Sequence, residues 1–116
     1  MPQPADPSSE RAVVEEYLDA HARADVAAAA ALFTTDAVVV DDGGTHRGRT
    51  EVVAWLEQTS TAWTYSAVST TSLARRDGQW VVDRHLEGDF PGGAVDLAYA
   101  FVVSEGAVAA LTIRPA

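Results

Sequence analysis

The chain has 116 residues, a length that suits one domain whose core folds without disulfide or metal support. It contains no Cys and no Lys, which excludes thiolate metal sites, Cys nucleophiles, Schiff-base catalysis and P-loop phosphate binding. Its formal net charge is -9, so we expect no nucleic acid partner. The sequence shows neither a membrane-spanning apolar run nor a secretory signal, and we expect a cytoplasmic protein with no membrane partner.

The first half of the chain predicts helices. Residues 1–7 are rich in Pro, and we expect a flexible lead-in there, followed by a single domain over residues 8–116. Apolar residues recur at helical spacing from residue 8 to about residue 23, which predicts an amphipathic helix. Asp25 is placed to cap a second, Ala-rich helix over residues 26–33.

The remainder of the chain predicts one strand, one helix and then a series of strands. Residues 37–41 are a run of β-branched character that ends in acids and glycines, and Thr50 is a plausible N-cap for a third helix. Asp77-Gly78 is a strong signal for a two-residue hairpin turn. Turn residues divide the later segment into strands near 64–76, 79–89, 94–103 and 107–114.

This order of elements predicts an α+β fold: a cone-like barrel in which a curved mixed or antiparallel sheet wraps around about three N-terminal helices. Alternation along the strand near 79–89 points Arg84 inward and His85 outward, whereas a β-bulge would exchange the two. The sequence leaves both possibilities open. An inward Arg84 would be costly unless it met a carboxylate or an acidic ligand.

Several segments along the chain resemble one family. They are Glu16-Tyr17-Leu18, Ala31-Leu32-Phe33, Asp36-Ala37-Val38-Val39-Val40-Asp41, His46-Arg47-Gly48-Arg49, Gly88-Asp89-Phe90-Pro91-Gly92-Gly93 and Tyr99-Ala100-Phe101. From about residue 9 onward the chain resembles the SnoaL-like branch of the nuclear transport factor 2-like superfamily. That superfamily includes ketosteroid isomerases, polyketide cyclases, dehydratases, epoxide hydrolases and proteins with no enzymatic role, so the resemblance implies a fold more than a reaction.

Two residues correspond to catalytic positions of the steroid isomerases in this superfamily. The resemblance implies that Tyr17 is a hydrogen-bond donor on the first helix and that Asp41 is a general base at the end of the first strand. The second oxyanion donor falls on Leu97, which cannot donate, so true steroid isomerase activity is not expected. A milder enolisation, an aldol-type cyclisation or a dehydration needs only a base and one donor.

The other expected site residues would line an apolar pocket for a small hydrophobic carbonyl compound. They are Arg84, His85, Trp55, Trp63, Trp80, Leu97, Tyr99 and Phe101. We expect no metal site and no cofactor. The alternative is a non-catalytic ligand-binding or dimerisation module in which Asp41 is ion-paired to Arg84 and the cavity is filled.

The family also implies a homodimer. The outward positions of the predicted sheet support this, since they carry more apolar area than a solvated face needs. These positions include Val81, Ala98, Ala100 and Val102.

Overall fold

The computed structural model describes residues 7–41, 44–62, 65–70, 73–89 and 91–115. For residues 7–8 and 60–70 this description covers the backbone alone. Its helices are α1 (Pro7–Ala22), α2 (Val26–Ala31) and α3 (Gly48–Ala62). Its strands are β1 (Phe33–Asp41), β2 (Gly44–Arg47), β3 (Tyr65–Thr70), β4 (Ala74–Arg76), β5 (Gln79–Gly88), β6 (Ala94–Ser104) and β7 (Ala107–Pro115). The predicted lead-in lies outside the described residues except for Pro7, which begins α1.

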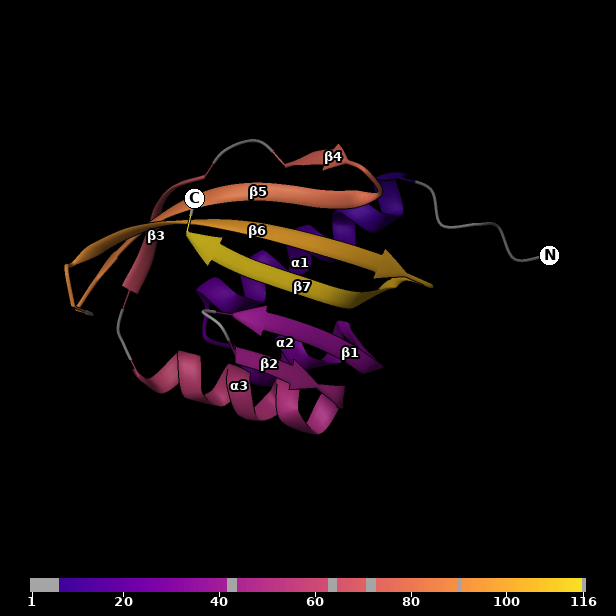
Figure 1. The fold of residues 1–116 in the computed structure, drawn as a ribbon, viewed down its shortest axis with the longest axis horizontal. Coiled ribbons are helices and arrows are strands. Elements are labelled where there is room, and N and C mark those ends of the chain that lie inside the picture. Colours follow the sequence, from indigo (N-terminus) through magenta and orange to yellow (C-terminus); the bar gives the residue numbers. More distant parts are fainter. Residues whose placement is uncertain (1–6, 42–43, 63–64, 71–72, 90, 116) are drawn as a thin grey trace.

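The strands form one mixed sheet in the order β2-β1-β7-β6-β5-β3, and β4 pairs with the opposite end of β5 from β3 (Figure 1). The pairing of β1 with β7 is parallel, and the other pairings are antiparallel. Two separate strands, β3 and β4, replace the single strand predicted near 64–76. The β4–β5 hairpin turns at Asp77-Gly78 as predicted, with φ of +51° and +77°.

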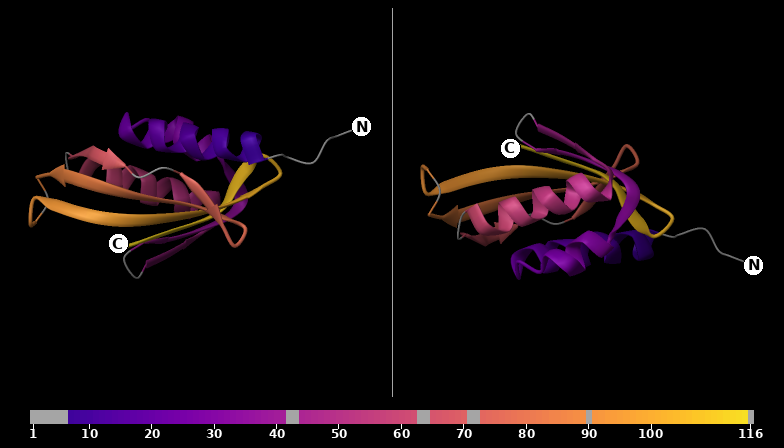
Figure 2. Two further views of the ribbon diagram at one scale, coloured as in Figure 1. Left: turned by 90° about the horizontal axis from the view of Figure 1, so that it is seen from above. Right: turned by 90° about the horizontal axis from the view of Figure 1, so that it is seen from below.

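The three helices lie on the same side of the strongly curved sheet (Figure 2), and α3 runs beside β2 at one edge of it (Figure 1). The core fills the space between these layers, and its largest fully buried side chains are Tyr17, Phe33, Phe101, Leu56 and Leu111. The predicted α+β architecture is therefore confirmed. The sheet remains open between its β2 and β3 edges and does not close into a barrel.

The predicted second helix is too long by two residues. It ends at Ala31, and Phe33 already belongs to β1. The reason is a long-range contact, because the Val108 N–H donates to the Leu32 carbonyl over 2.7 Å and Phe33 pairs with Val108. The Ala run is helical as predicted, and tertiary pairing ends the helix directly after it.

The third helix begins before the predicted cap. It starts at Gly48, so Thr50 lies inside the first turn. The short strand β2, which the sequence did not predict, leads directly into it. Glu51 accepts a hydrogen bond from the Arg47 backbone N–H over 2.8 Å, which satisfies a donor at the start of the helix.

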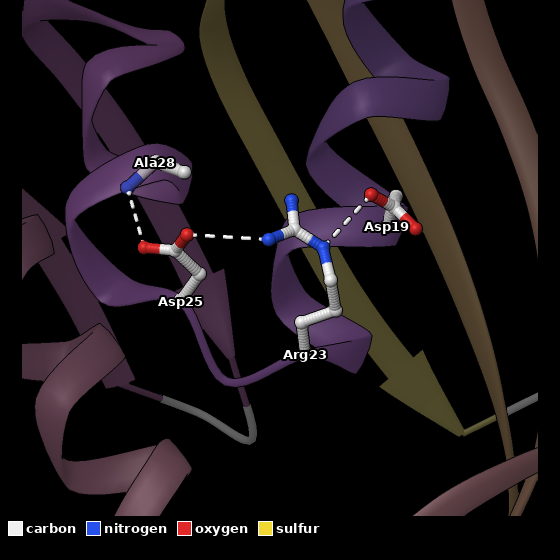
Figure 3. Close-up of polar contacts among 4 residues, drawn as sticks. All are labelled: Asp19, Arg23, Asp25 and Ala28. Carbon is white, nitrogen blue, oxygen red and sulfur yellow. Dashed lines mark hydrogen bonds and ion pairs between the residues drawn. The ribbon is translucent and has the colours of Figure 1, made fainter.

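The connection between α1 and α2 is held by a chain of polar contacts around Asp25 (Figure 3). One carboxylate oxygen of Asp25 accepts the Ala28 backbone N–H over 3.1 Å, which confirms Asp25 as the N-cap of α2. The other oxygen accepts from Arg23 over 3.3 Å, and Arg23 also donates to Asp19 over 3.0 Å.

Within the described ranges, no helix combines the length and hydropathy needed to cross a membrane.

Candidate functional site

A pocket of about 650 Å³ lies at the end of the sheet where β1, β5 and β7 end and β6 begins. Its lining mixes apolar side chains with a few polar ones: His21, Asp41, Gly44, His46, Trp55, Gln58, Thr59, Leu86, Pro91, Ala94, Val95, Leu97, Tyr99, Ile113, Arg114 and Pro115. This volume and this lining are typical of small-molecule sites.

Asp41 is the last residue of β1 and the one carboxylate among the described lining residues. The indole N–H of Trp55, on α3, donates to Asp41 Oδ2 over 2.9 Å. Trp55 is itself buried and lines the pocket, so its rigid ring fixes the orientation of the carboxylate. Within the described part of the chain no side chain bonds the second oxygen, Oδ1, which can accept a proton from a ligand.

His21 enters the pocket wall from the last turn of α1. Its ring stacks on Tyr17, one helical turn earlier, with the ring centroids 5.8 Å apart. Burial, and next the positive charge of Arg84, lower the pKa of His21 to about 4. His21 is therefore neutral at pH 7, and its two ring nitrogens can donate one hydrogen bond and accept one.

Tyr99 lines the same pocket from β6 and is almost fully buried. Burial raises the pKa of Tyr99, the Asp41 charge raises it further, and the charge of Arg84 and a hydrogen bond with it act in the opposite direction. The hydroxyl consequently stays protonated at neutral pH and can donate to a ligand oxygen. The guanidinium carbon of Arg84 lies 5.6 Å from the centroid of the Tyr99 ring.

The β5–β6 register resolves the open choice between Arg84 and His85. It runs without a shift from Trp80 opposite Phe101 to Glu87 opposite Ala94, so no bulge exchanges the two residues. Arg84 lies on the inward face and is 5 % exposed, but it is not among the residues that line the pocket.

His85, which we expected as a pocket residue, lies on the outer face of the sheet. Its Nδ1 is 2.6 Å from an Asp96 carboxylate oxygen, and its Nε2 is 3.1 Å from one of Glu87. The hydrogen bond with Asp96, and next the hydrogen bond with Glu87, raise the pKa of His85. The strict alternation of the strand directs its side chain away from the pocket.

Three other expected site residues also lie away from the pocket lining. Tyr17 and Phe101 are fully buried and pack edge to face with their ring centroids 5.5 Å apart, and Tyr17 makes the same kind of contact with Phe33. Trp80 is buried at the start of β5, whereas the pocket lies at the end of that strand, and its indole N–H donates to Glu10 over 3.1 Å. These three aromatic side chains, which we expected in the pocket lining, are part of the core. Trp63 lies outside the described residues.

Of the expected site residues, Asp41, Trp55, Leu97 and Tyr99 meet around the pocket. The sequence did not single out Gln58 and Thr59, which join Trp55 on α3, or residues 113–115 of β7, which form part of the wall. Among the lining residues that were not expected, His21 alone follows from a helical pattern in the sequence. It is four residues from Tyr17, so the two residues lie on the same face of the helix.

Strand β2 also contributes a lining residue, His46. His46 lies beside Trp55 with ring centroids 6.0 Å apart, although its strand was not predicted. Across the residues with described positions, no group of three or more His, Asp and Glu side chains is arranged to hold a metal ion.

Comparison with known proteins identifies the family. The profile of the SnoaL-like domain matches residues 14–109. The Sinorhizobium meliloti protein SMa1630, a proposed polyketide cyclase, is 31% identical, with a TM-score of 0.82 over 89% of this chain and 94% of that one. No curated protein matches the chain significantly.

Two more distant structures share the fold. A nuclear transport factor 2-like protein from Burkholderia xenovorans is 18% identical, with a TM-score of 0.79 over 94% of this chain and 90% of that one. SalBIII, an epoxide hydrolase/cyclase-like enzyme with a role in pyran ring formation in the polyether salinomycin, is 19% identical, with a TM-score of 0.77 over 96% and 93%. With its helices on one side of a curved mixed sheet, the chain belongs to the SnoaL-like domain family and has the nuclear transport factor 2-like fold.

Proposed function

We propose that this protein is a general-base enzyme that isomerises, cyclises or dehydrates a small apolar carbonyl compound, with Asp41 as the base. The observation that carries the proposal is the Asp41 carboxylate, held by the Trp55 indole at the wall of an open, largely apolar pocket. This chemistry needs proton transfer alone, and it calls for no cofactor. The similarity to a proposed polyketide cyclase supports ring formation as one form of the reaction.

The first step is removal of a proton from the carbon next to the substrate carbonyl by Asp41 Oδ1. The electron pair of that C–H bond moves into the carbonyl, and the resulting enolate oxygen accepts a hydrogen bond from the Tyr99 hydroxyl. Return of the proton to another carbon isomerises the substrate. Attack of the enolate on a second carbonyl of the same molecule instead closes a ring, and the new alkoxide then takes the proton.

Tyr99 replaces Tyr17 as the donor in this proposal because Tyr99 lines the pocket and Tyr17 packs in the core. Leu97 also lines the pocket but offers no donor, so the oxyanion would be stabilised by one tyrosine. Neutral His21 lies in the same wall. One strong donor suits an activated substrate, such as a 1,3-dicarbonyl compound, better than a simple ketone.

The alternative function is a non-catalytic ligand-binding or dimerisation module. That hypothesis expects an Asp41–Arg84 ion pair and a filled cavity. No such pair occurs among the described side chains, where Asp41 is bonded by Trp55, and the pocket is open. These observations favour the enzyme, while leaving ligand binding as part of its action.

The test is exchange of the α-hydrogens of an apolar 1,3-diketone for deuterium, followed by NMR. We expect Asp41→Asn to lower the protein-catalysed rate by about 100-fold or more, the usual contribution of a general base. Asp36→Asn is the matched control, because Asp36 is exposed on the same strand. Tyr99→Phe should lower the rate more than Tyr17→Phe does. Equal rates for wild type and Asp41→Asn would remove Asp41 from the chemistry and leave the binding module.

We also propose that the protein forms a homodimer through the outer face of its sheet. Small apolar residues of four adjacent strands share that face and are only half-buried in the single chain: Val38, Val40, Val81, Ala98, Ala100, Val102 and Ala110. Covering such a surface with a second copy would remove apolar area from water.

A further inference from the structure

Arg84 is an unusual residue for its position. It projects from the inward face of β5 between Val82 and Leu86, and all three are buried. Removing a guanidinium from water is energetically costly unless a partner offsets the loss. A buried arginine in an apolar layer therefore needs an anionic or strongly polar acceptor.

The described part of the chain does not supply such an acceptor in full. No described carboxylate pairs with Arg84, and its Nε and Nη1 have no hydrogen-bond partner there. Its guanidinium carbon lies 5.6 Å from the centroid of the Tyr99 ring, which is a cation–π contact, and a hydrogen bond joins Arg84 and Tyr99. Two donor atoms are left for another group.

Arg84 does not itself line the pocket, and its guanidinium lies directly behind residues that do. Its neighbour on the same strand face, Leu86, and its partner across the β5–β6 pairing, Leu97, both line the cavity. Tyr99, over which the guanidinium lies, lines it as well. The charge of Arg84 also depresses the pKa of His21, a fourth lining residue, so its field extends into the pocket.

We propose that Arg84 binds a carboxylate of the ligand, so that the pocket selects small apolar acids over neutral molecules of the same shape. This deepens the proposed function, on which it rests for the pocket being a ligand site. A planar guanidinium suits a carboxylate because two N–H groups can donate in parallel. The protein's net charge of -9 repels anions, so an inward cation is what would make an acid acceptable.

The arrangement also orients the ligand. Asp41 is the one carboxylate of the described lining, and it repels an acid group placed beside it. The ligand carboxylate is therefore held at Arg84, and the enolisable carbon is presented to Asp41. The substrate class is then a small apolar keto acid, with its acid group separated from the reacting carbon.

The test compares two probes of nearly equal shape, 4-phenylbutanoate and 4-phenylbutanamide, by isothermal titration calorimetry at pH 7. We expect the acid to bind wild type at least tenfold more tightly than the amide, and we expect Arg84→Met to abolish this preference. The melting temperature of unliganded Arg84→Met should equal or exceed that of wild type, since a buried charge without a full partner has been removed. Equal affinity of wild type for the two probes, or no binding of either, overturns the proposal. So does an Arg84→Met variant that keeps the preference.

A second measurement uses wild type alone and decides the matter if Arg84→Met does not fold. A bound carboxylate offsets the charge of Arg84, so the His21 pKa followed by NMR should rise with 4-phenylbutanoate and not with 4-phenylbutanamide. An unchanged His21 pKa with saturating acid overturns the proposal. Asp41→Asn should keep the acid preference, so a failure of the base chemistry and a failure of this inference give different results.

Discussion

The lowered pKa of His21 makes the stability of this protein dependent on pH in a defined window. In the unfolded chain His21 takes up a proton near pH 6.5, whereas in the folded protein it does so near pH 4. Between these values the unfolded state binds one more proton than the folded state. The contribution of His21 to stability is therefore fully present above pH 6.5 and is lost as the pH falls toward 4.

The size of this effect follows from the two pKa values. Lowering the pH from 7.5 to 5.0 should reduce the free energy of unfolding by about 2 kcal/mol through His21 alone. Urea denaturation of wild type and His21→Gln, followed by circular dichroism at both pH values, measures it. The variant loses the stacking on Tyr17 at every pH, so the readout is the difference between the two pH values within each protein.

His85 provides a control of opposite sign. Its pKa is raised by Asp96 and Glu87, so its contribution is present below pH 6.5 and is lost as the pH rises through the folded pKa. His21→Gln should flatten the loss of stability in acid, and His85→Gln should steepen it. If wild type and His21→Gln lose the same stability between pH 7.5 and 5.0, or if NMR places the His21 pKa near 6.5, the reasoning from burial is wrong.

Two further predictions concern the fold and the assembly. Asp25→Ala removes the N-cap of α2 and should lower the free energy of unfolding by about 1 kcal/mol, or the melting temperature by about 4 °C, in a thermal scan. Glu16→Ala, on an exposed face of α1, should change it by less than about 0.5 kcal/mol, and an equal effect of the two would contradict the capping role. Ala100→Arg places a charge at the centre of the outer sheet face, and size-exclusion chromatography with light scattering should show wild type as a dimer and the variant as a monomer. A monomeric wild type at micromolar concentration would refute the dimer.

The parts of the fold that local sequence determines were predictable. The Asp77-Gly78 turn needs positive φ at both residues, and Asp and Gly tolerate it. These two residues were therefore enough to predict the hairpin. The cap at Asp25 depends on an N–H only three residues away. Alternation along β5 and β6 assigned the inward and outward faces, because the pairing runs without a bulge along that stretch.

The remaining features depend on contacts between distant residues. Phe33 was assigned to a helix because nothing nearby reveals its pairing with Val108. The candidate base, Asp41, was found from its place after a strand, but its partner Trp55 comes from a helix whose approach only the folded chain defines. Tyr17 shows the limit of a resemblance, since the matched position lies in the core and a tyrosine of another strand lines the pocket.

The parallel pairing of β1 with β7 has a consequence for folding. Val39 of β1 lies opposite Leu111 of β7, which follows every other described strand in the chain. The helical half of the domain and the antiparallel strands are thus joined by a strand that comes late in the sequence. Closing so large a loop is entropically costly, and we expect slow folding in which β7 inserts late between two partly formed halves.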